Sequence, residues 1–338
     1  MLQSHRKTMS RRRSLQILAA SSLTLALGSS LANPTAAGSP DTAKIQWRGV
    51  VLGAKADLTF YLADRAAGEQ LMARLLQEVE RLEQIFSLYR NDSDLSRLNR
   101  QGWLAEPPQD LVTLLARSQR FADLTGGAFD VTVQPLWRLL AQSEQRPDRA
   151  ALKQALDLID SRAIALSPAR VAFAKAGMAV TLNGIAQGYI TDRVTTLLKA
   201  AGLRSVLVNL GEARALAGPP HKPAWRVGLQ DPDKPEKLLE VLALNNRALA
   251  TSARPAALAG SPDPDRLPNL LDPRRGRAPN RYRSLSVLAD DATTADALST
   301  GFSALPPAQI QARLAALRNV EVLLFPNGGG RRHLVSAS

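Results

Sequence analysis

The chain has 338 residues, of which 45% are hydrophobic and 22% charged, as in a soluble globular protein of one large or two ordinary domains. Its formal charge of +13 suggests a nucleic acid, a membrane surface or an anionic ligand as partner, although five basic residues lie within residues 1–32. Cysteine is absent, which excludes a disulfide framework, a thiol nucleophile and zinc–thiolate or iron–sulfur sites. Beyond residue 32 the only histidines are His221 and His333. Metal chemistry would therefore rely on oxygen ligands, which suit hard cations such as Mg²⁺.

Residues 1–32 have the three parts of a signal peptide. Three arginines, Arg11–Arg13, precede an apolar run from Leu15 to Leu27, and Ser30-Leu31-Ala32 offers the small residues of a cleavage site. The run is too short to span a bilayer, so we expect no integral membrane protein. The Arg12-Arg13-Ser14-Leu15 segment is similar to a twin-arginine signal, and the general secretory route is the alternative. We expect a periplasmic protein whose residues 33–43 form a flexible linker.

Short strands and amphipathic helices alternate along the first half of the folded part. The hydrophobic pattern predicts, in chain order, strands at 45–52 and 56–62, a helix at 71–85, a short helix ending at Asn99, a helix from Pro108 to Gly126, and a helix at 152–159 followed by two strands. Ala128-Phe129-Asp130 comes directly after the Gly126-Gly127 pair. By themselves, Phe129 reads as a core residue and Asp130 as a turn residue.

The stretch from Val180 to Asp192 predicts a strand end, a break at Asn183-Gly184 and a helix closed by Gly202. Glycine after a strand allows another group to approach the backbone, and a helix N-terminus attracts anions. A tight turn, with Gly184 and Gly188 spaced for close helix packing, explains the same residues without a ligand.

Four further strands are predicted at residues 206–210, 225–230, 239–244 and 248–252. Short strands interspersed with helices favour an α+β fold over a regular doubly wound sheet. The loop at 268–277 then carries Arg274, Arg275 and Arg277. It is either a solvated basic loop or a phosphate-attracting one. Aromatic residues make up only 4% of the chain and do not alternate with these arginines, so we expect no nucleic acid partner.

The segment from Asp290 to Gly301 predicts a buried helix. Thr293 or Thr294 is a suitable N-cap for a helix from Ala295 to Leu305. Asp296 and Thr300 stand four residues apart, so their oxygens lie on one helix face and can share one Mg²⁺. Such a pair is often only a solvated helix face. The apolar residues around it indicate burial, however, and a buried aspartate needs a partner.

Eight segments taken together resemble the ApbE family of flavin transferases (FAD:protein FMN transferases). They occur in the family's order over about residues 45–330: Phe86–Asn99, Thr125–Asp130, Asn183–Asp192, Val208–Gly211, Trp225–Pro232, Ala250–Ser252, Leu271–Gly276 and Thr294–Thr300. The resemblance implies an α+β domain at 44–330 with mixed, largely antiparallel sheets flanked by helices. Residues 331–338 would be a C-terminal tail.

The resemblance also implies a site and a reaction. Mg²⁺ would be held by the Gly184 carbonyl and by the side chains of Asp296 and Thr300, which are the expected catalytic pair. The expected FAD contacts are Tyr89, Ala128, Phe129, Asp130, Gln187 and Leu271. Family members move FMN from FAD onto a threonine hydroxyl of a partner protein and release AMP. The acceptor would be a flavoprotein of an exported or membrane-bound electron-transfer system.

The sequence departs from the family pattern at Thr181, Gln187, Ala253 and Asn269. Family members commonly have histidine where Asn269 stands, and asparagine cannot transfer a proton at neutral pH. Two other functions are therefore kept as alternatives to the transferase. The chain could be a pyrophosphatase that releases FMN and AMP from FAD, or a periplasmic FAD-binding protein without catalysis.

Overall fold

The computed structural model describes residues 23–24, 43–142, 147–253 and 270–337. Asn269, linker residues 33–42 and nearly all of the expected signal peptide lie outside these residues. Ala43, predicted as the last residue of the linker, instead begins a strand. The helices are α1 (Arg65–Phe86), α2 (Asp94–Gln101), α3 (Gln109–Thr125), α4 (Gln134–Gln142), α5 (Arg149–Asp157), α6 (Ala186–Ala200), α7 (Ala292–Phe302) and α8 (Pro307–Leu314). The strands are β1 (Leu23–Thr24), β2 (Ala43–Val51), β3 (Ala54–Leu62), β4 (Trp103–Ala105), β5 (Ile164–Leu166), β6 (Arg170–Phe173), β7 (Val206–Asn209), β8 (Ala213–Leu216), β9 (Trp225–Gln230), β10 (Leu238–Leu244), β11 (Ala248–Ala253), β12 (Tyr282–Ala289), β13 (Glu321–Pro326) and β14 (Arg332–Val335).

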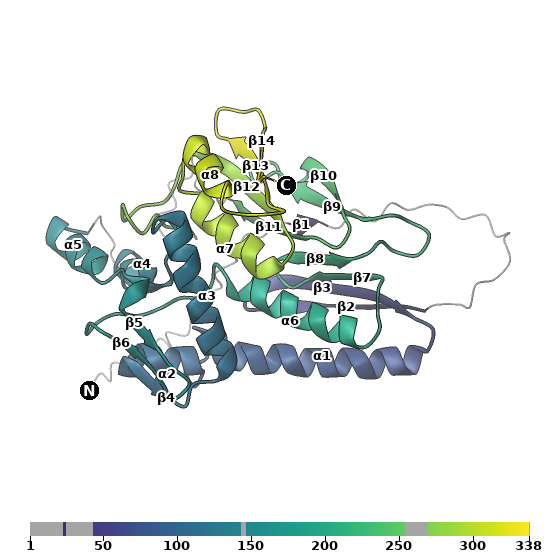
Figure 1. Cartoon of the computed structure of the whole chain (residues 1–338), viewed down its shortest axis with the longest axis horizontal. Coiled ribbons are helices and arrows are strands. Elements are labelled where there is room, and N and C mark those ends of the chain that lie inside the picture. Colours follow the sequence, from purple (N-terminus) through teal and green to yellow (C-terminus); the bar gives the residue numbers. More distant parts are fainter. Residues whose placement is uncertain (1–22, 25–42, 143–146, 254–269, 338) are drawn as a thin grey trace, which may run out of the picture.

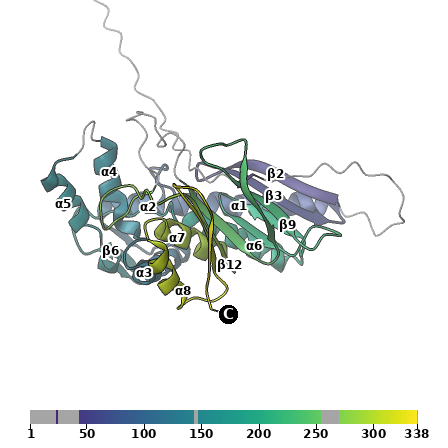
Figure 2. The same ribbon diagram turned by 90° about the horizontal axis from the view of Figure 1, so that it is seen from above.

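Within the described residues, eight strands form one sheet in the order β14-β13-β12-β11-β8-β7-β3-β2. Two smaller sheets have the orders β1-β9-β10 and β4-β6-β5. Every strand pairing described is antiparallel. Helices α1, α6 and α7 run along one face of the large sheet (Figures 1 and 2). The predicted α+β fold with antiparallel sheets and flanking helices is therefore confirmed.

The large sheet separates two hydrophobic layers because side chains alternate along each strand. On β7, Val206 and Val208 belong to the core formed with α1 and α6, whereas Leu207 belongs to a second core on the other face. Trp225 and Val227 of β9 cover that second core. Both faces of the central strands are thus buried. Strands buried on both faces are nearly continuous apolar runs, as Val206–Val208 of β7 shows.

One predicted element is absent: residues 180–182 form no strand. The side-chain amide of Asn99 replaces a neighbouring strand at Val180, donating to its carbonyl at 2.8 Å and accepting from its N–H at 2.7 Å. The N–H of Thr181 donates to the Val131 carbonyl at 2.8 Å. The backbone is hydrogen-bonded at this point without a strand ladder, and periodicity could not distinguish the two cases.

The predicted cap of α7 is also wrong. The helix begins at Ala292, and its N-cap is Asp291, whose side chain accepts from the Thr294 N–H at 2.9 Å. Thr293 and Thr294 lie inside the first turn, and the hydroxyl of Thr293 donates to Asp192 on α6 at 2.5 Å. The helix ends at Phe302 rather than Leu305.

Residues 331–338 are not a simple tail. Arg332–Val335 form β14, which pairs with β13 at the edge of the large sheet. Ser336 then exchanges two hydrogen bonds with the backbone of Val320, at 2.9 and 3.0 Å. This strand has only four residues, too few for an alternation of polar and apolar side chains to indicate a strand in the sequence. None of the helices in the described part is both long and apolar enough to cross a membrane.

Candidate active site between helices α6 and α7

Helices α6 and α7 pack closely because Gly188 has no side chain. The Gly188 N–H donates to Asp296 Oδ2 at 3.0 Å across the contact. A Cβ atom placed at Gly188 would lie 2.3 Å from the Ala292 carbonyl oxygen, closer than real Cβ atoms come. The interpretation of Gly188 as a helix-packing glycine is confirmed. The same packing brings Asp296 to the start of α6.

The three predicted metal-ligating residues meet at this contact. A Cβ atom at Gly184 would lie 2.8 Å from Thr300 Oγ1, so the Thr300 side chain lies directly on the Gly184 backbone. Asp296 precedes Thr300 by one helical turn. Within the described residues, neither Asp296 Oδ1 nor Thr300 Oγ1 has a hydrogen-bond partner. A carboxylate, a hydroxyl and a nearby carbonyl form an oxygen set that fits a hard cation such as Mg²⁺.

No cluster of three or more histidine or acidic side chains suited to a metal occurs in the described ranges. A cation held here would therefore depend on one carboxylate, with neutral oxygens completing the set. Mg²⁺ usually keeps several waters and takes only one or two protein carboxylates, so a site of this kind fits it.

Burial raises the pKa of Asp296 to about 7, opposed by the Gly188 hydrogen bond and assisted by the negative charge of Asp192. Glu212 is a second buried acid close to Asp296. Burial and the charge of Asp296 hold the pKa of Glu212 well above its usual range, while a hydrogen bond from the Thr251 N–H lowers it. Among the described residues, no basic side chain pairs with either of these two buried carboxyl groups. Such a pair favours binding of a cation, since a cation stabilises the ionised forms.

Two predicted flavin-binding residues lie beside this contact. Tyr89 is half-exposed, and its pKa is raised by burial and lowered by a side-chain hydrogen bond with Asn183, the residue before Gly184. Gln187 is buried instead, and its side-chain amide lies against Gly211, where a Cβ atom would come within 2.5–2.8 Å. Tyr89 is therefore the more accessible of the two.

Ala128 and Phe129 are buried, and Phe129 lies against Gly301, one residue beyond Thr300. Asp130 is committed to local structure, since its side chain accepts from the N–H and hydroxyl of Thr132 at 2.8 and 2.6 Å. It also accepts from the Ser161 N–H at 3.1 Å. The turn interpretation of Asp130 thus accounts for its side chain, and the segment packs directly beside the Thr300 end of α7.

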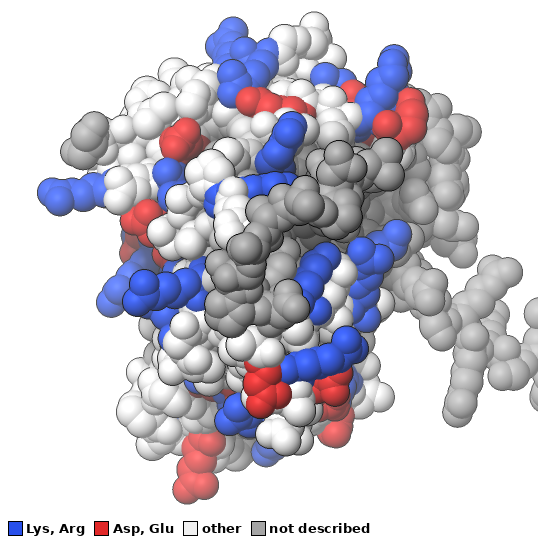
Figure 3. Space-filling view, turned by 90° about the vertical axis from the view of Figure 1, so that its right-hand side faces the viewer, with Lys and Arg blue, Asp and Glu red and all other residues white. Residues whose placement is uncertain are grey.

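Residues 270–277, the described part of the loop that carries Arg274, Arg275 and Arg277, lie near the C-terminal end of α7. Leu271 is half-buried beside Asp272, whose carboxylate is bound by Arg274 at 2.8 and 2.9 Å. A surface hollow beside it is lined by residues that include Arg275, Arg277, Arg281 and Ala304. Elsewhere, basic and acidic side chains are interspersed on the face in Figure 3 rather than gathered in a stripe. The hollow, in contrast, has a local excess of positive charge.

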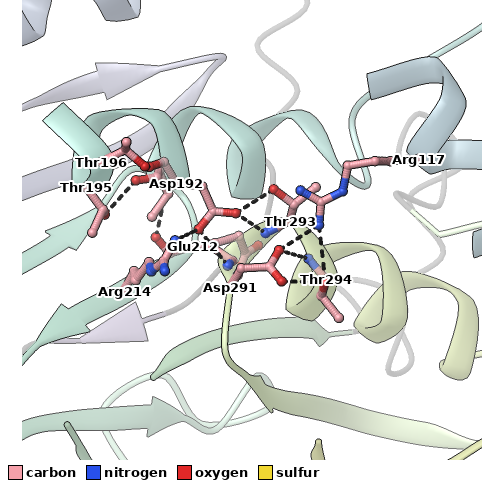
Figure 4. Close-up of polar contacts among 11 residues, drawn as sticks. Arg117, Asp192, Thr195, Thr196, Glu212, Arg214, Asp291, Thr293 and Thr294 are labelled. Carbon is pink, nitrogen blue, oxygen red and sulfur yellow. Dashed lines mark hydrogen bonds and ion pairs between the residues drawn. The ribbon is translucent and has the colours of Figure 1, made fainter. Parts of the chain in front are cut away.

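Sequence reasoning missed the polar network around the first turn of α7 (Figure 4). Asp192 of α6 accepts from the Ala292 and Thr293 N–H groups at 2.8 and 2.9 Å and pairs with Arg214 of β8. Arg117 of α3 donates to Asp291 Oδ1 at 2.7 Å. Glu212 was missed as well. The sequence offered one signal for each residue. Asp192 is an acid one helical turn after Gly188, and Glu212 is a charged residue just after a buried strand.

Comparison with known proteins identifies the family of the chain. Residues 52–324 match the model of the ApbE family. A FAD:protein FMN transferase of Treponema pallidum (strain Nichols) is 32% identical over 288 residues, which cover 78% of each chain. A FAD:protein FMN transferase of Vibrio cholerae (strain O395) is 30% identical over 251 residues, covering 71% of this chain and 74% of its own.

Solved structures share the fold. The flavin transferase ApbE from Vibrio cholerae superposes with a TM-score of 0.75 at 25% identity, over 88% of this chain and 98% of its own. The apo form of the Pseudomonas stutzeri flavinyl transferase ApbE gives 0.73 at 24% identity, over 87% and 95%. The fold is thus that of the flavin transferase class. The chain belongs to the ApbE family.

Proposed function

We propose that this chain is a Mg²⁺-dependent flavin transferase that moves FMN from FAD onto a threonine hydroxyl of a partner protein. The observation that carries the proposal is the meeting of Gly184, Asp296 and Thr300, with two side-chain oxygens left without partners in the described residues of an ApbE-family chain. In the reaction, the hydroxyl oxygen bonds to the FMN phosphorus while the pyrophosphate bond of FAD breaks. AMP leaves, and the hydroxyl proton is released.

The residues divide the work by charge. Asp296 supplies the anionic oxygen that would hold the cation, and Thr300 and the Gly184 carbonyl supply neutral ones. A bound divalent cation would stabilise the negative charge that develops on the phosphoryl oxygens. Tyr89 borders the site and is half-exposed, so its ring is suited to contact the flavin, whose rings stack on aromatic groups. Phe129 is buried beside Gly301 and supports the Thr300 end of the site through packing. The arginine-lined hollow favours an anionic substrate.

The proposal is tested by incubating the protein with FAD and Mg²⁺, with and without a threonine-bearing acceptor. We expect flavin fluorescence to migrate with the acceptor in a denaturing gel, together with one AMP per flavin transferred. AMP formation without an acceptor would instead identify a pyrophosphatase. FAD binding with neither product would identify a binding protein.

We further propose that the protein is exported to the bacterial periplasm, on the strength of the tripartite pattern in residues 1–32. Sequencing the N-terminus of protein recovered from a periplasmic extract is expected to give a start near Asn33. Replacing Arg12 and Arg13 together by lysine should leave the precursor in the cytoplasm if the twin-arginine route is used. An intact Met1 in the periplasmic fraction would contradict cleavage.

A further inference from the structure

Hydrogen bonds join α6 and α7 at two levels. On each helix, the residues that make them are four apart, which is about one turn. At the first level, the Gly188 N–H donates to Asp296 Oδ2 at 3.0 Å. At the second, Asp192 accepts from the first two N–H groups of α7, those of Ala292 and Thr293. Residues four apart on a helix lie on the same face, so the helices run antiparallel with Gly188 opposite Asp296 and Asp192 opposite Ala292. The second contact therefore limits how α7 can tilt or slide at the position of Asp296.

The hydrogen-bond and ion-pair partners of Asp192 described at this contact are all donors. Its Oδ1 accepts from the Ala292 N–H and pairs with Arg214, and its Oδ2 accepts from the N–H and the hydroxyl of Thr293, at 2.9 and 2.5 Å (Figure 4). A carboxylate can satisfy all of these donors because it is acceptor-only when ionised. An asparagine of the same shape would direct its NH₂ group at one set of donors and lose those bonds.

We propose that Asp192 is a positioning residue of the metal site: it binds the N-terminus of α7 from the neighbouring helix and so holds Asp296 and Thr300 against Gly184. The inference rests on the proposed function, since it concerns the same cation. Asp192 does not reach the ligand oxygens itself. It acts through the placement of the helix that carries them, as groups around a metal site orient its ligands.

The chain offers a matched control in Asp291. Asp291 also bonds the first turn of α7, accepting from the Thr294 N–H and from the Thr294 hydroxyl, at 2.9 and 2.7 Å. Its other partner is Arg117 of α3, so it makes no bond to α6. Replacing either aspartate by asparagine removes one negative charge near the same helix end and one cap. Only the Asp192 change removes a bond between the helix that carries Asp296 and the helix that follows Gly184.

The test is calorimetric titration of Mg²⁺ into the full-length folded protein, with thermal unfolding measured in parallel. We expect Asp192→Asn to raise the Kd for Mg²⁺ by about tenfold or more, in the range found for groups that orient metal ligands. Asp291→Asn should lower the unfolding temperature but leave the Kd within about twofold of the wild type. Thr293→Val removes only the hydroxyl bond to Asp192 and should raise the Kd by about two- to threefold. If Asp192→Asn does not fold, the Kd of Thr293→Val still tests the positioning role.

Each result is decisive. An unchanged Kd in Asp192→Asn and Thr293→Val, with tight binding in the wild type, would overturn the positioning role and leave the proposed function standing. An equal rise in Kd for the Asp192 and Asp291 variants would overturn it too, because charge or stability alone would then explain the effect. Absence of Mg²⁺ binding by the wild-type protein would overturn the metal site of the proposed function, and this inference with it.

Discussion

Replacing Asp296 by asparagine is expected to lower the rate of flavin transfer by about three powers of ten. Asp296 has the one anionic side chain among the three proposed ligands, and asparagine keeps its shape and hydrogen bonding but not its charge. A metal ion supplies several kcal/mol of charge stabilisation in such reactions, and about 4 kcal/mol corresponds to that factor. The measurement is the transfer rate as a function of Mg²⁺ concentration, alongside thermal unfolding.

Thr300→Ala should show a milder loss, partly restored by high Mg²⁺, because water can replace one neutral ligand. Asp157→Asn is the matched control, since Asp157 forms an exposed ion pair with Lys153 on α5 and should leave transfer unchanged. If Asp296 were only a buried packing residue, its loss would lower stability by about 1–3 kcal/mol and leave catalysis intact in the folded molecules. Near-full activity of Asp296→Asn at low Mg²⁺ would therefore refute the metal site.

Gly188→Ala is expected to destabilise the protein by about 3 kcal/mol. The new Cβ would fall 2.3 Å from the Ala292 carbonyl oxygen and 2.9 Å from Asp296 Cβ, and backbone atoms cannot rotate away. The better helix propensity of alanine returns only about 1 kcal/mol. Separation of α6 from α7 would also stretch the Gly188–Asp296 hydrogen bond. Chemical denaturation should therefore show lower stability, and the Kd for Mg²⁺ should rise.

Gly328→Ala is the control for this substitution, because no described residue other than its chain neighbours comes within 4 Å of a Cβ atom built at Gly328. We expect its stability to stay within about 0.5 kcal/mol of the wild type. If Gly188→Ala were equally harmless, the close approach of the two helices would not be required, and the spacing of Asn183, Gly184 and Gly188 would need another explanation.

Part of the site could be predicted because it depends on local geometry. Asp296 and Thr300 share a face since residues four apart on a helix are neighbours, whatever the rest of the fold does. The glycine at 188 likewise indicated close helix packing, and the structure confirms it. The assignment of ligands and flavin contacts, in contrast, came from resemblance to a family, and the structure brings Gly184, Asp296 and Thr300 together independently.

The fold class followed from patterns of period two and 3.6, which most of the elements display. The errors occurred where a side chain took the place of a backbone partner. Asn99 provides the hydrogen bonds that a strand would have given Val180, and Asp192 engages Thr293, which looked like a cap. The partners in these two pairs are 81 and 101 residues apart in the chain, so no local pattern in the sequence can predict them.

Sequence by itself determined that this chain folds as an α+β protein, that α7 is buried, and that an acid and a hydroxyl project from one of its faces. These features depend on side chains a few residues apart, where backbone geometry dictates which ones are neighbours. Tertiary structure alone decided that Gly188 lies opposite Asp296, 108 residues away, and that Asp192 holds the first turn of α7. Contacts of that range arise only when the large sheet places α6 and α7 side by side on one face, because burial of both apolar faces is what brings the helices together.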